Sequence, residues 1–418
     1  MTGRDATLCF AAFAVLTFSG CKKALPPDTL CTYEALPPTA DVPAGQGAIE
    51  VLGSTDAYFY AFDSTAKQIG SHPVNGLLSI KPGDYVLKVN NSVHPVAVQE
   101  KMVTKCSTGT VLPSATTDES YYIFDNSGTQ LAGAHLGNGL SLFPGSYRVR
   151  LNNSETAANV RAGAITELKP GTVNVEVSTD ESYAIFDTGA KQLASGHVGR
   201  ALGLFAGNYN VKINNSQAQV EVRAGERSSV PVGTLVTQGS TDENYYVFDN
   251  AGTQLASAHL ARPMAFFPGA YNVKVNNSAV PATVTPTTLS EVKSGTLVVQ
   301  GTTDENYAVF DTAGTQLASA HLGRPLAFVP GEYRVKINNV PIAVRTEPDH
   351  TSEYAAGTLT VKSAGSENYL VLDLAGTQLA ARQLNQPISL PAGKYSVKVG
   401  NNARPVAIVP GQAVVVTW

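Results

Sequence analysis

Histidine and arginine recur three residues apart at one position of a repeated segment. The three pairs are His197 and Arg200, His259 and Arg262, and His321 and Arg324. Successive copies could present a ladder of weak sites to an anionic glycan or peptidoglycan strand, with avidity replacing the strength of a single site. The alternative is a solvent-facing loop copied by duplication, because TQLASAHL is identical at 253–260 and 315–322.

Serine, histidine and aspartate also occur together, as a hydrolase would require. Ser319 and His321 share one face of an expected strand, and Asp304 lies nearby in the sequence. The histidine position, however, holds Pro73 in the first copy and Gln383 in the last. The polar side of an exposed hairpin explains these residues more simply. We therefore predict that no residue is catalytic and that the protein is not an enzyme.

The histidines do not have the spacing of a metal site. One histidine position is shared by His135, His197, His259 and His321 in successive copies of 62 residues. A globule of this length is about 25 Å across, so one ion could not hold several of them. The sequence contains no HExxH or CxxC spacing, no glycine-rich phosphate loop and no Rossmann fingerprint. We expect neither a metal nor a cofactor.

Charge and hydropathy exclude two further classes. The chain has 29 basic and 33 acidic side chains, a net charge of −4, and no run of like charge. A nucleic-acid-binding surface would need a basic stripe, so we expect no nucleic acid partner. No stretch after the leader reaches the ~18 apolar residues that a spanning helix needs.

The histidine–arginine pairs belong to a tandem repeat with a step of 62 residues, marked in five copies by a Gly-Thr pair and more weakly in the first by Gly47. The expected boundaries are a leader at 1–46 and repeats at 47–108, 109–170, 171–232, 233–294, 295–356 and 357–418. No linker separates the repeats, and missing such a period would misassign the fold.

Each repeat reads as a small antiparallel β unit. In the fifth, Tyr333, Val335 and Ile337 alternate with polar residues, and no window has helical spacing. Glycine, proline, asparagine and aspartate separate strands of five to seven residues. We expect a turn in which the Asp311 carboxylate bonds the backbone ahead, and a left-handed hairpin turn at Asn338-Asn339.

Comparison of the copies separates folding from function. Five positions carry the same residue in all six repeats, namely Asp311, Gln316, Gly331, Tyr333 and Asn339 with their equivalents. Because even the divergent last repeat keeps them, we attribute them to folding. A tyrosine column at Tyr121, Tyr183, Tyr245, Tyr307 and Tyr369 is interpreted as core rather than as a platform for sugar rings.

The segment LFPGSYRV at 142–149 resembles the Pro-Gly-x-Tyr hairpin of PEGA-like modules and other small prealbumin-type β-sandwiches, and YAVFDTAG at 307–314 looks like their strand and turn. Such modules occur in tandem in bacterial envelope proteins, usually without catalytic residues. The resemblance implies six β-sandwich-like repeats in an elongated array. A six-bladed β-propeller is the alternative fold.

The leader resembles a bacterial lipoprotein signal. An apolar stretch from Ala6 to Phe18 precedes Ser19, Gly20 and Cys21, and it is short for a spanning helix. The resemblance implies cleavage of a signal peptide at 1–20, acylation (palmitate) of Cys21 and a membrane anchor. Because Lys22 and not aspartate follows Cys21, it also implies export to the outer membrane of a Gram-negative bacterium. An ordinary secretory signal or an uncleaved anchor is the alternative.

Residues 21–46 are proline-rich and are expected to form a tether between the lipid and the repeats. Cys31 and Cys106 could form a disulfide in an oxidising envelope. Alternatively Cys106 is simply a small core residue, because its position is apolar in every other repeat.

The sequence therefore favours a non-enzymatic, lipid-anchored envelope protein whose repeats act as a stalk or interaction scaffold. Its expected partners are the membrane, through the lipid, and cell-wall polymer or envelope proteins. The alternative is a module that binds cell-wall or surface polysaccharide through the histidine–arginine positions of the central repeats. A third possibility is an enzyme, or a closed propeller with a central pocket.

Overall fold

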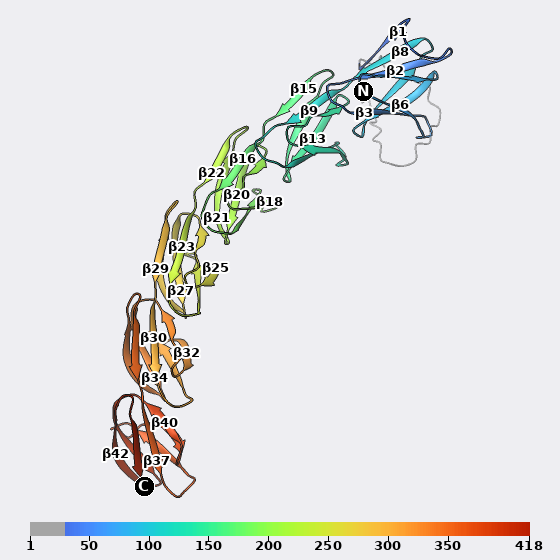
Figure 1. Ribbon diagram of the computed structural model, residues 1–418. Helices are drawn as coiled ribbons and strands as arrows, with labels where there is room; N and C mark the ends of the chain where they lie inside the picture. The colour runs from blue at the N-terminus through green and yellow to red at the C-terminus, as the bar shows by residue number, and fades with distance from the viewer. Residues whose placement is uncertain (1–29) are drawn as a thin grey trace, which may run out of the picture. The chain divides into compact units, whose positions relative to one another are not determined.

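The computed structural model describes residues 30–418, and every regular element within them is a β-strand (Figure 1). The all-β class predicted from the alternating pattern is confirmed. Within these residues no helix is long and apolar enough to cross a membrane.

The fifth repeat shows the plan of all the others. Its strands are β30 (Gly295–Gln300), β31 (Asn306–Phe310), β32 (Gln316–His321), β33 (Leu326–Phe328), β34 (Gly331–Ile337), β35 (Val340–Thr346) and β36 (Thr351–Ala355). They form a three-stranded sheet in the order β33-β30-β36 and a four-stranded sheet in the order β32-β31-β34-β35. The last strand, β36, returns parallel to β30, whereas the other pairs are antiparallel.

The other repeats use the same order. The first contains β1 (Cys31–Ala35), β2 (Gly47–Leu52), β3 (Tyr58–Phe62), β4 (Gln68–Pro73), β5 (Leu77–Ile80), β6 (Gly83–Val89), β7 (Ser92–Val98) and β8 (Met102–Ser107). The second contains β9 (Gly109–Pro113), β10 (Ser120–Phe124), β11 (Gln130–His135), β12 (Leu140–Leu142), β13 (Gly145–Leu151), β14 (Ser154–Val160) and β15 (Ile165–Leu168). The third contains β16 (Gly171–Val175), β17 (Ser182–Phe186), β18 (Gln192–His197), β19 (Leu202–Leu204), β20 (Gly207–Ile213), β21 (Ser216–Val222) and β22 (Arg227–Val230).

The fourth contains β23 (Gly233–Gln238), β24 (Asn244–Phe248), β25 (Gln254–His259), β26 (Met264–Phe266), β27 (Gly269–Val275), β28 (Ser278–Val284) and β29 (Leu289–Lys293). The last contains β37 (Gly357–Lys362), β38 (Asn368–Leu372), β39 (Gln378–Gln383), β40 (Pro387–Leu390), β41 (Gly393–Val399), β42 (Asn402–Ile408) and β43 (Ala413–Thr417). Apart from the added strand β1, each repeat opens with a strand that begins at the glycine of its Gly-Thr pair, or at Gly47 in the first repeat.

The strand pairing excludes a propeller. A propeller blade is one four-stranded sheet, whereas the strands of each repeat are divided between two separate sheets. In the fifth repeat both sheets contribute to one core, in which Leu297 and Val299 of β30 pack with Tyr307 and Val309 of β31. The repeats are therefore small β-sandwiches, as expected, and the propeller alternative is wrong.

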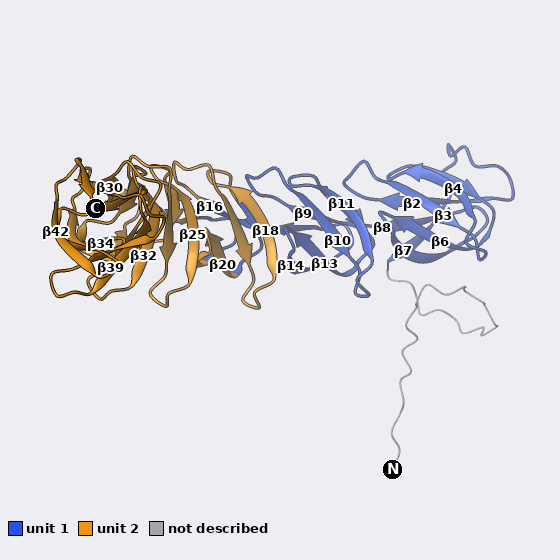
Figure 2. Cartoon of the chain, turned by 90° about the horizontal axis from the view of Figure 1, so that it is seen from below, with its two compact units in different colours: residues 1–173, 202–207, 221–228 blue, residues 174–201, 208–220, 229–418 orange. Residues whose placement is uncertain are grey.

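The chain divides into two compact units (Figure 2). Unit 1 holds the described residues up to 173 together with 202–207 and 221–228, and unit 2 holds 174–201, 208–220 and 229–418. The first two repeats lie in unit 1 and the last three in unit 2, while the strands of the third are shared between them.

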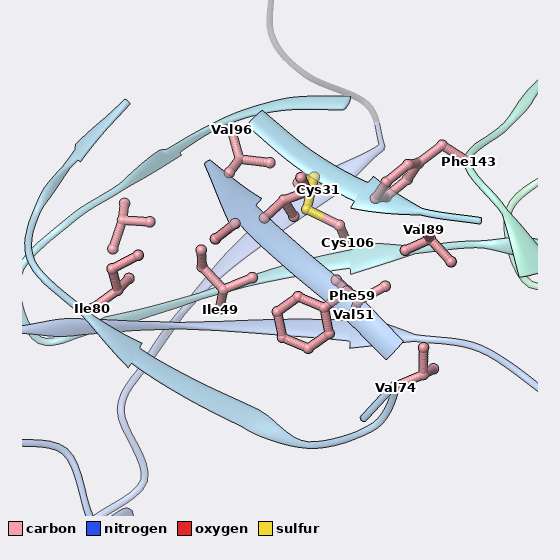
Figure 3. Close-up of a cluster of buried hydrophobic side chains, with 13 residues drawn as sticks. Cys31, Ile49, Val51, Phe59, Val74, Ile80, Val89, Val96, Cys106 and Phe143 are labelled. Atoms are coloured by element: carbon pink, nitrogen blue, oxygen red, sulfur yellow. A yellow bond between two sulfur atoms is a disulfide. The ribbon is translucent and has the colours of Figure 1, made fainter. Parts of the chain in front are cut away.

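The first repeat has an added strand that the sequence did not predict. β1 pairs antiparallel with β8 and extends the sheet to the order β1-β8-β2-β5. Cys31 and Cys106 face each other across this pair and are joined by a disulfide within the core (Figure 3).

The expectation that all of 21–46 forms a tether is therefore wrong for Cys31–Ala35. These residues belong to the first sandwich, where the disulfide and the pairing with β8 hold them. The rest of the leader to residue 29, including the signal peptide at 1–20 and Cys21, lies outside the described residues.

The turns have the geometry that their residues indicate. Asn338 and Asn339 have φ angles of 47° and 60°, in the left-handed region that asparagine tolerates. The Asp311 carboxylate accepts the backbone N–H of Thr315 at 2.7 Å, and Gly314 has φ 90°. At the position of Gly314 the third repeat has Ala190, with φ 64°.

Candidate functional site

The histidine–arginine positions lie on exposed turns. Each histidine is the last residue of β18, β25 or β32, and the arginine three residues on donates its backbone N–H to the histidine carbonyl at 3.0–3.1 Å. All six side chains are exposed. The structure thus repeats one hairpin corner, and each of these corners belongs to unit 2.

A buried tyrosine fixes that corner through the arginine backbone rather than its side chain. The hydroxyls of Tyr183, Tyr245 and Tyr307 donate to the carbonyl oxygens of Arg200, Arg262 and Arg324 at 2.6–2.7 Å. The same bond reaches Asn138 in the second repeat and Gln386 in the last. Burial raises the pKa of four tyrosines of this column, so they stay protonated donors; they are Tyr121, Tyr245, Tyr307 and Tyr369. The corner is therefore independent of the arginine side chain, and the tyrosine column is core, as predicted.

The arginine guanidinium groups have no ion pair or hydrogen bond to a side chain within residues 30–418. His321 lies 3.6 Å from Asp304, with the two side chains 67% and 98% exposed. At such exposure an ion pair contributes on the order of 0–1 kcal/mol. The guanidinium groups lie on exposed turns, where a ligand could reach them from solvent.

The serine of the hydrolase interpretation is not assembled with its partners. Ser319 lies two residues before His321 on β32, and no hydrogen bond joins their side chains. In the third repeat the serine beside the histidine is a different one, since Ser182 Oγ lies 3.2 Å from His197 Nδ1. In the described part of the chain, no group of three His, Cys, Asp or Glu side chains could hold a metal. A cavity of about 310 Å³ lies elsewhere, lined by Glu243, Asn244, Tyr246, Asn276 and Asn277.

That cavity lies beside a contact between repeats that the sequence did not predict. Asn276, the first residue of its Asn-Asn turn, donates through Nδ2 to the Ala327 carbonyl of the next repeat at 3.0 Å and to Glu243 at 2.9 Å. Both carboxylate oxygens of Glu243 accept the Ala327 N–H at 3.3 Å. We call this arrangement of asparagine, glutamate and the next repeat's backbone the junction clasp.

Three further clasps repeat it. They are Asn152 with Glu119 on Gly203, Asn214 with Glu181 on Ala265, and Asn338 with Glu305 on Ser389. The first lies within unit 1 and the other two, like that of Asn276, within unit 2. The second asparagine of the turn adds a bond, since Asn277 donates to the Leu317 carbonyl at 2.9 Å.

A serine and an apolar side chain complete the junction. Ser278 accepts the N–H of Val329 in the next repeat at 3.0 Å, and Val329 itself belongs to the core of the fourth repeat. Likewise Phe143 packs into the core of the first repeat. At the last junction valine, Val340, replaces the serine, and the residue opposite is Pro391, which has no N–H to donate. The two changes fit each other, since a serine there would have no donor.

The first and the last repeat depart from this pattern, although Asn90 of the first repeat still donates to the Ser141 carbonyl of the second at 3.0 Å. Ala57 stands at the glutamate position in the first repeat, and Gly400 stands at the first asparagine position in the last. The sequence therefore carried a signal that was missed: the first turn asparagine is present in every repeat that another repeat follows.

The comparisons with known proteins add no identification. No family model matches the chain, and no curated protein matches it. Among solved structures, the TIE protein of Bacillus anthracis aligns over 95% of this chain and 75% of its own, at 12% identity and a TM-score of 0.15. BcpA, the major pilin subunit of Bacillus cereus, aligns over 54% of this chain and 96% of its own, at 9% identity and a TM-score of 0.14. The pilus adhesin SpaC of Lactobacillus rhamnosus GG aligns over 87% and 57%, at 10% identity and a TM-score of 0.14. TM-scores of this size carry no argument, so the fold rests on the strand pairing described above.

Proposed function

We propose that the protein is a non-enzymatic, lipid-anchored component of the bacterial cell envelope whose repeats act as a stalk or interaction scaffold. The observation that carries the proposal is the junction clasp. The recurring polar residues join one sandwich to the next, and the sixth repeat has Gly400 in place of the first asparagine. The polar residues that the repeats share therefore serve to connect neighbouring modules.

The PEGA-like resemblance fits this proposal. In five repeats the tyrosine of the Gly-x-Tyr segment donates to the carbonyl four residues earlier, as Tyr333 does to Val329 at 2.6 Å and Tyr395 to Pro391 at 2.8 Å. This bond ties the turn to the start of the next strand and gives the motif a folding role.

Placement in the envelope rests on the leader. Cleavage before Cys21 and acylation of its thiol would hold the protein on a membrane without a spanning helix. The test is metabolic labelling with a palmitate analogue, followed by separation of inner and outer membranes. We expect label in the outer membrane fraction, and none on a Cys21→Ser variant. Label that survives in the variant, or a soluble parent protein, would overturn the placement.

Polysaccharide binding is the second candidate, supported by the exposed guanidinium groups of Arg200, Arg262 and Arg324, which have no side-chain ion pair within the described chain. Its test is sedimentation of the purified protein with peptidoglycan or capsule. Binding that falls steeply when the three arginines are replaced by alanine would favour this candidate. The matched control is His135→Ala in the second repeat, where asparagine replaces the arginine. Absence of the parent protein from the pellet would exclude it.

A further inference from the structure

The outer edge of the short sheet is covered in the first repeat and open in the last. In the first repeat β1 pairs along β8. Within residues 30–418, the equivalents of β8 in the other repeats are edge strands with no partner on that side; they are β15, β22, β29, β36 and β43. An open edge offers unpaired N–H and C=O groups to another strand, and proteins commonly block it with a charged residue.

The blocking charge lies at the centre of the strand in four repeats, whereas the third repeat has Ser229 at the centre of β22 and carries its charge at the outward flank, on Arg227. At the central position the first repeat has Lys105, which bonds Glu34 of the added strand β1 at 2.7 Å. The second, fourth and fifth repeats have an exposed glutamate there, the last of them Glu353. The last repeat has Val415, which is 54% exposed. The remaining outward side chains of β43, Ala413 and Thr417, are also uncharged.

The backbone of β43 is oriented for pairing. Trp418 donates its N–H to Lys362 of β37, and Gln412 accepts from Thr358 of the same strand. Because alternate residues of a strand bond to opposite sides, Ala413, Val415 and Thr417 present their N–H and C=O groups to the open edge. One of these groups already has a partner, since Arg404 donates to the Thr417 carbonyl at 3.1 Å.

We propose that β43 pairs antiparallel with β43 of a second copy of this chain, about a two-fold axis through Val415. The pairing of β1 with β8 shows that this edge accepts an antiparallel strand and that the central residue must be matched. Self-pairing sets Val415 opposite Val415, which is favourable. In the second, fourth and fifth repeats it would set glutamate opposite glutamate, and like charges directly opposite are destabilising. Only the last of these edges is both open and uncharged at its centre and its outward flanks.

The test is sedimentation velocity of the full chain carrying Cys21→Ser, so that no acyl group drives association, at about 1–100 µM. The parent should show a concentration-dependent dimer. Val415→Glu should weaken it at least tenfold, and it should fold, because glutamate is the residue of three equivalent strands. The control Val409→Glu makes the same change on an exposed residue of the same repeat, outside β43, and should leave the dimer intact.

A gain of association tests the charge argument separately. Glu353→Val removes the blocking charge from β36 and should produce assemblies larger than a dimer, because the chain then has two edges that can pair with themselves. The proposal is overturned if the parent is monomeric or if the dimer survives Val415→Glu. It is also overturned if the dimer is lost on reduction of the Cys31–Cys106 disulfide, because that loss would indicate exchange of β1 between chains.

Discussion

Replacing Asn338 with glycine should uncouple the last repeat from the fifth. Glycine adopts the φ of 47° without strain, so the change removes the asparagine's two bonds in the clasp and leaves the turn. The lost bonds are one to the neutral carbonyl of Ser389 at 2.8 Å and one to the Glu305 carboxylate at 3.0 Å. In isolation these are worth about 1 and about 1.5–3 kcal/mol. Because Asn338 is only half-buried and water can replace part of each bond, we expect a loss of about 2 kcal/mol.

The chain provides its own reporter for this experiment. Trp418 is the only tryptophan, and it packs against the core of the last repeat under Arg404. Urea unfolding followed by its fluorescence therefore reads the last repeat alone. With a slope near 1 kcal/mol per molar urea for a module of this size, the midpoint should fall by about 2 M.

The matched control is Asn276→Gly, which removes the same contacts one junction earlier. Its effect on the tryptophan transition should be much smaller, because stability in a repeat array is passed mainly between neighbours. The free energy of unfolding of the last repeat should be lower in Asn338→Ala than in Asn338→Gly by about 1 kcal/mol, since alanine also strains the left-handed turn. A tryptophan midpoint unchanged in Asn338→Gly, or shifted equally by Asn276→Gly, would refute the reasoning.

Four further changes test other parts of the structure. Ala190→Gly should raise the free energy of unfolding by about 0.5–1 kcal/mol, because Ala190 holds a left-handed φ that glycine adopts freely; thermal unfolding measures it, and a loss would contradict it. Cys31→Ser should lower the stability of the first repeat by about 2–4 kcal/mol, read by proteolysis of that repeat, and equal resistance would speak against a structural disulfide. The pKa of Asp63 lies below its ordinary 3.8 because the turn's threonine hydroxyl and backbone amides donate to it, so its contribution is present above that value and lost as the pH falls through the lowered pKa; Asp63→Asn should show a shallower acid loss of stability. Val340→Ser should destabilise the last junction by about 1–3 kcal/mol and be partly rescued by Pro391→Val, which restores an N–H donor; purely additive effects of the two changes would argue against the pairing.

Local patterns were sufficient to predict the interior of each repeat. Alternation in 333–337 indicated β34, and the left-handed asparagines and the aspartate turn followed from the residue types. These features depend on contacts close in sequence, for which the side chains themselves are the evidence.

The junctions could not be predicted in the same way. Asn276 meets Ala327 across 51 residues, and Glu243 meets it across 84. Such partners are set by how one sandwich packs on the next, which no period within a repeat reveals. The β1 strand was missed for a related reason, since the prolines of 21–46 suggested a tether while its partner, β8, lies 75 residues away from Cys31.

The most direct test of the central claim is backbone hydrogen exchange at the amides that the clasp glutamates accept, at Ala265, Ala327 and Ser389. If the recurring residues serve to join repeats, these amides should exchange as slowly as strand interiors, and Glu305→Ala should accelerate Ser389 and leave Ala265 unchanged. Exchange at the rate of exposed loops in the parent protein, or no change at Ser389 in the variant, would contradict the account.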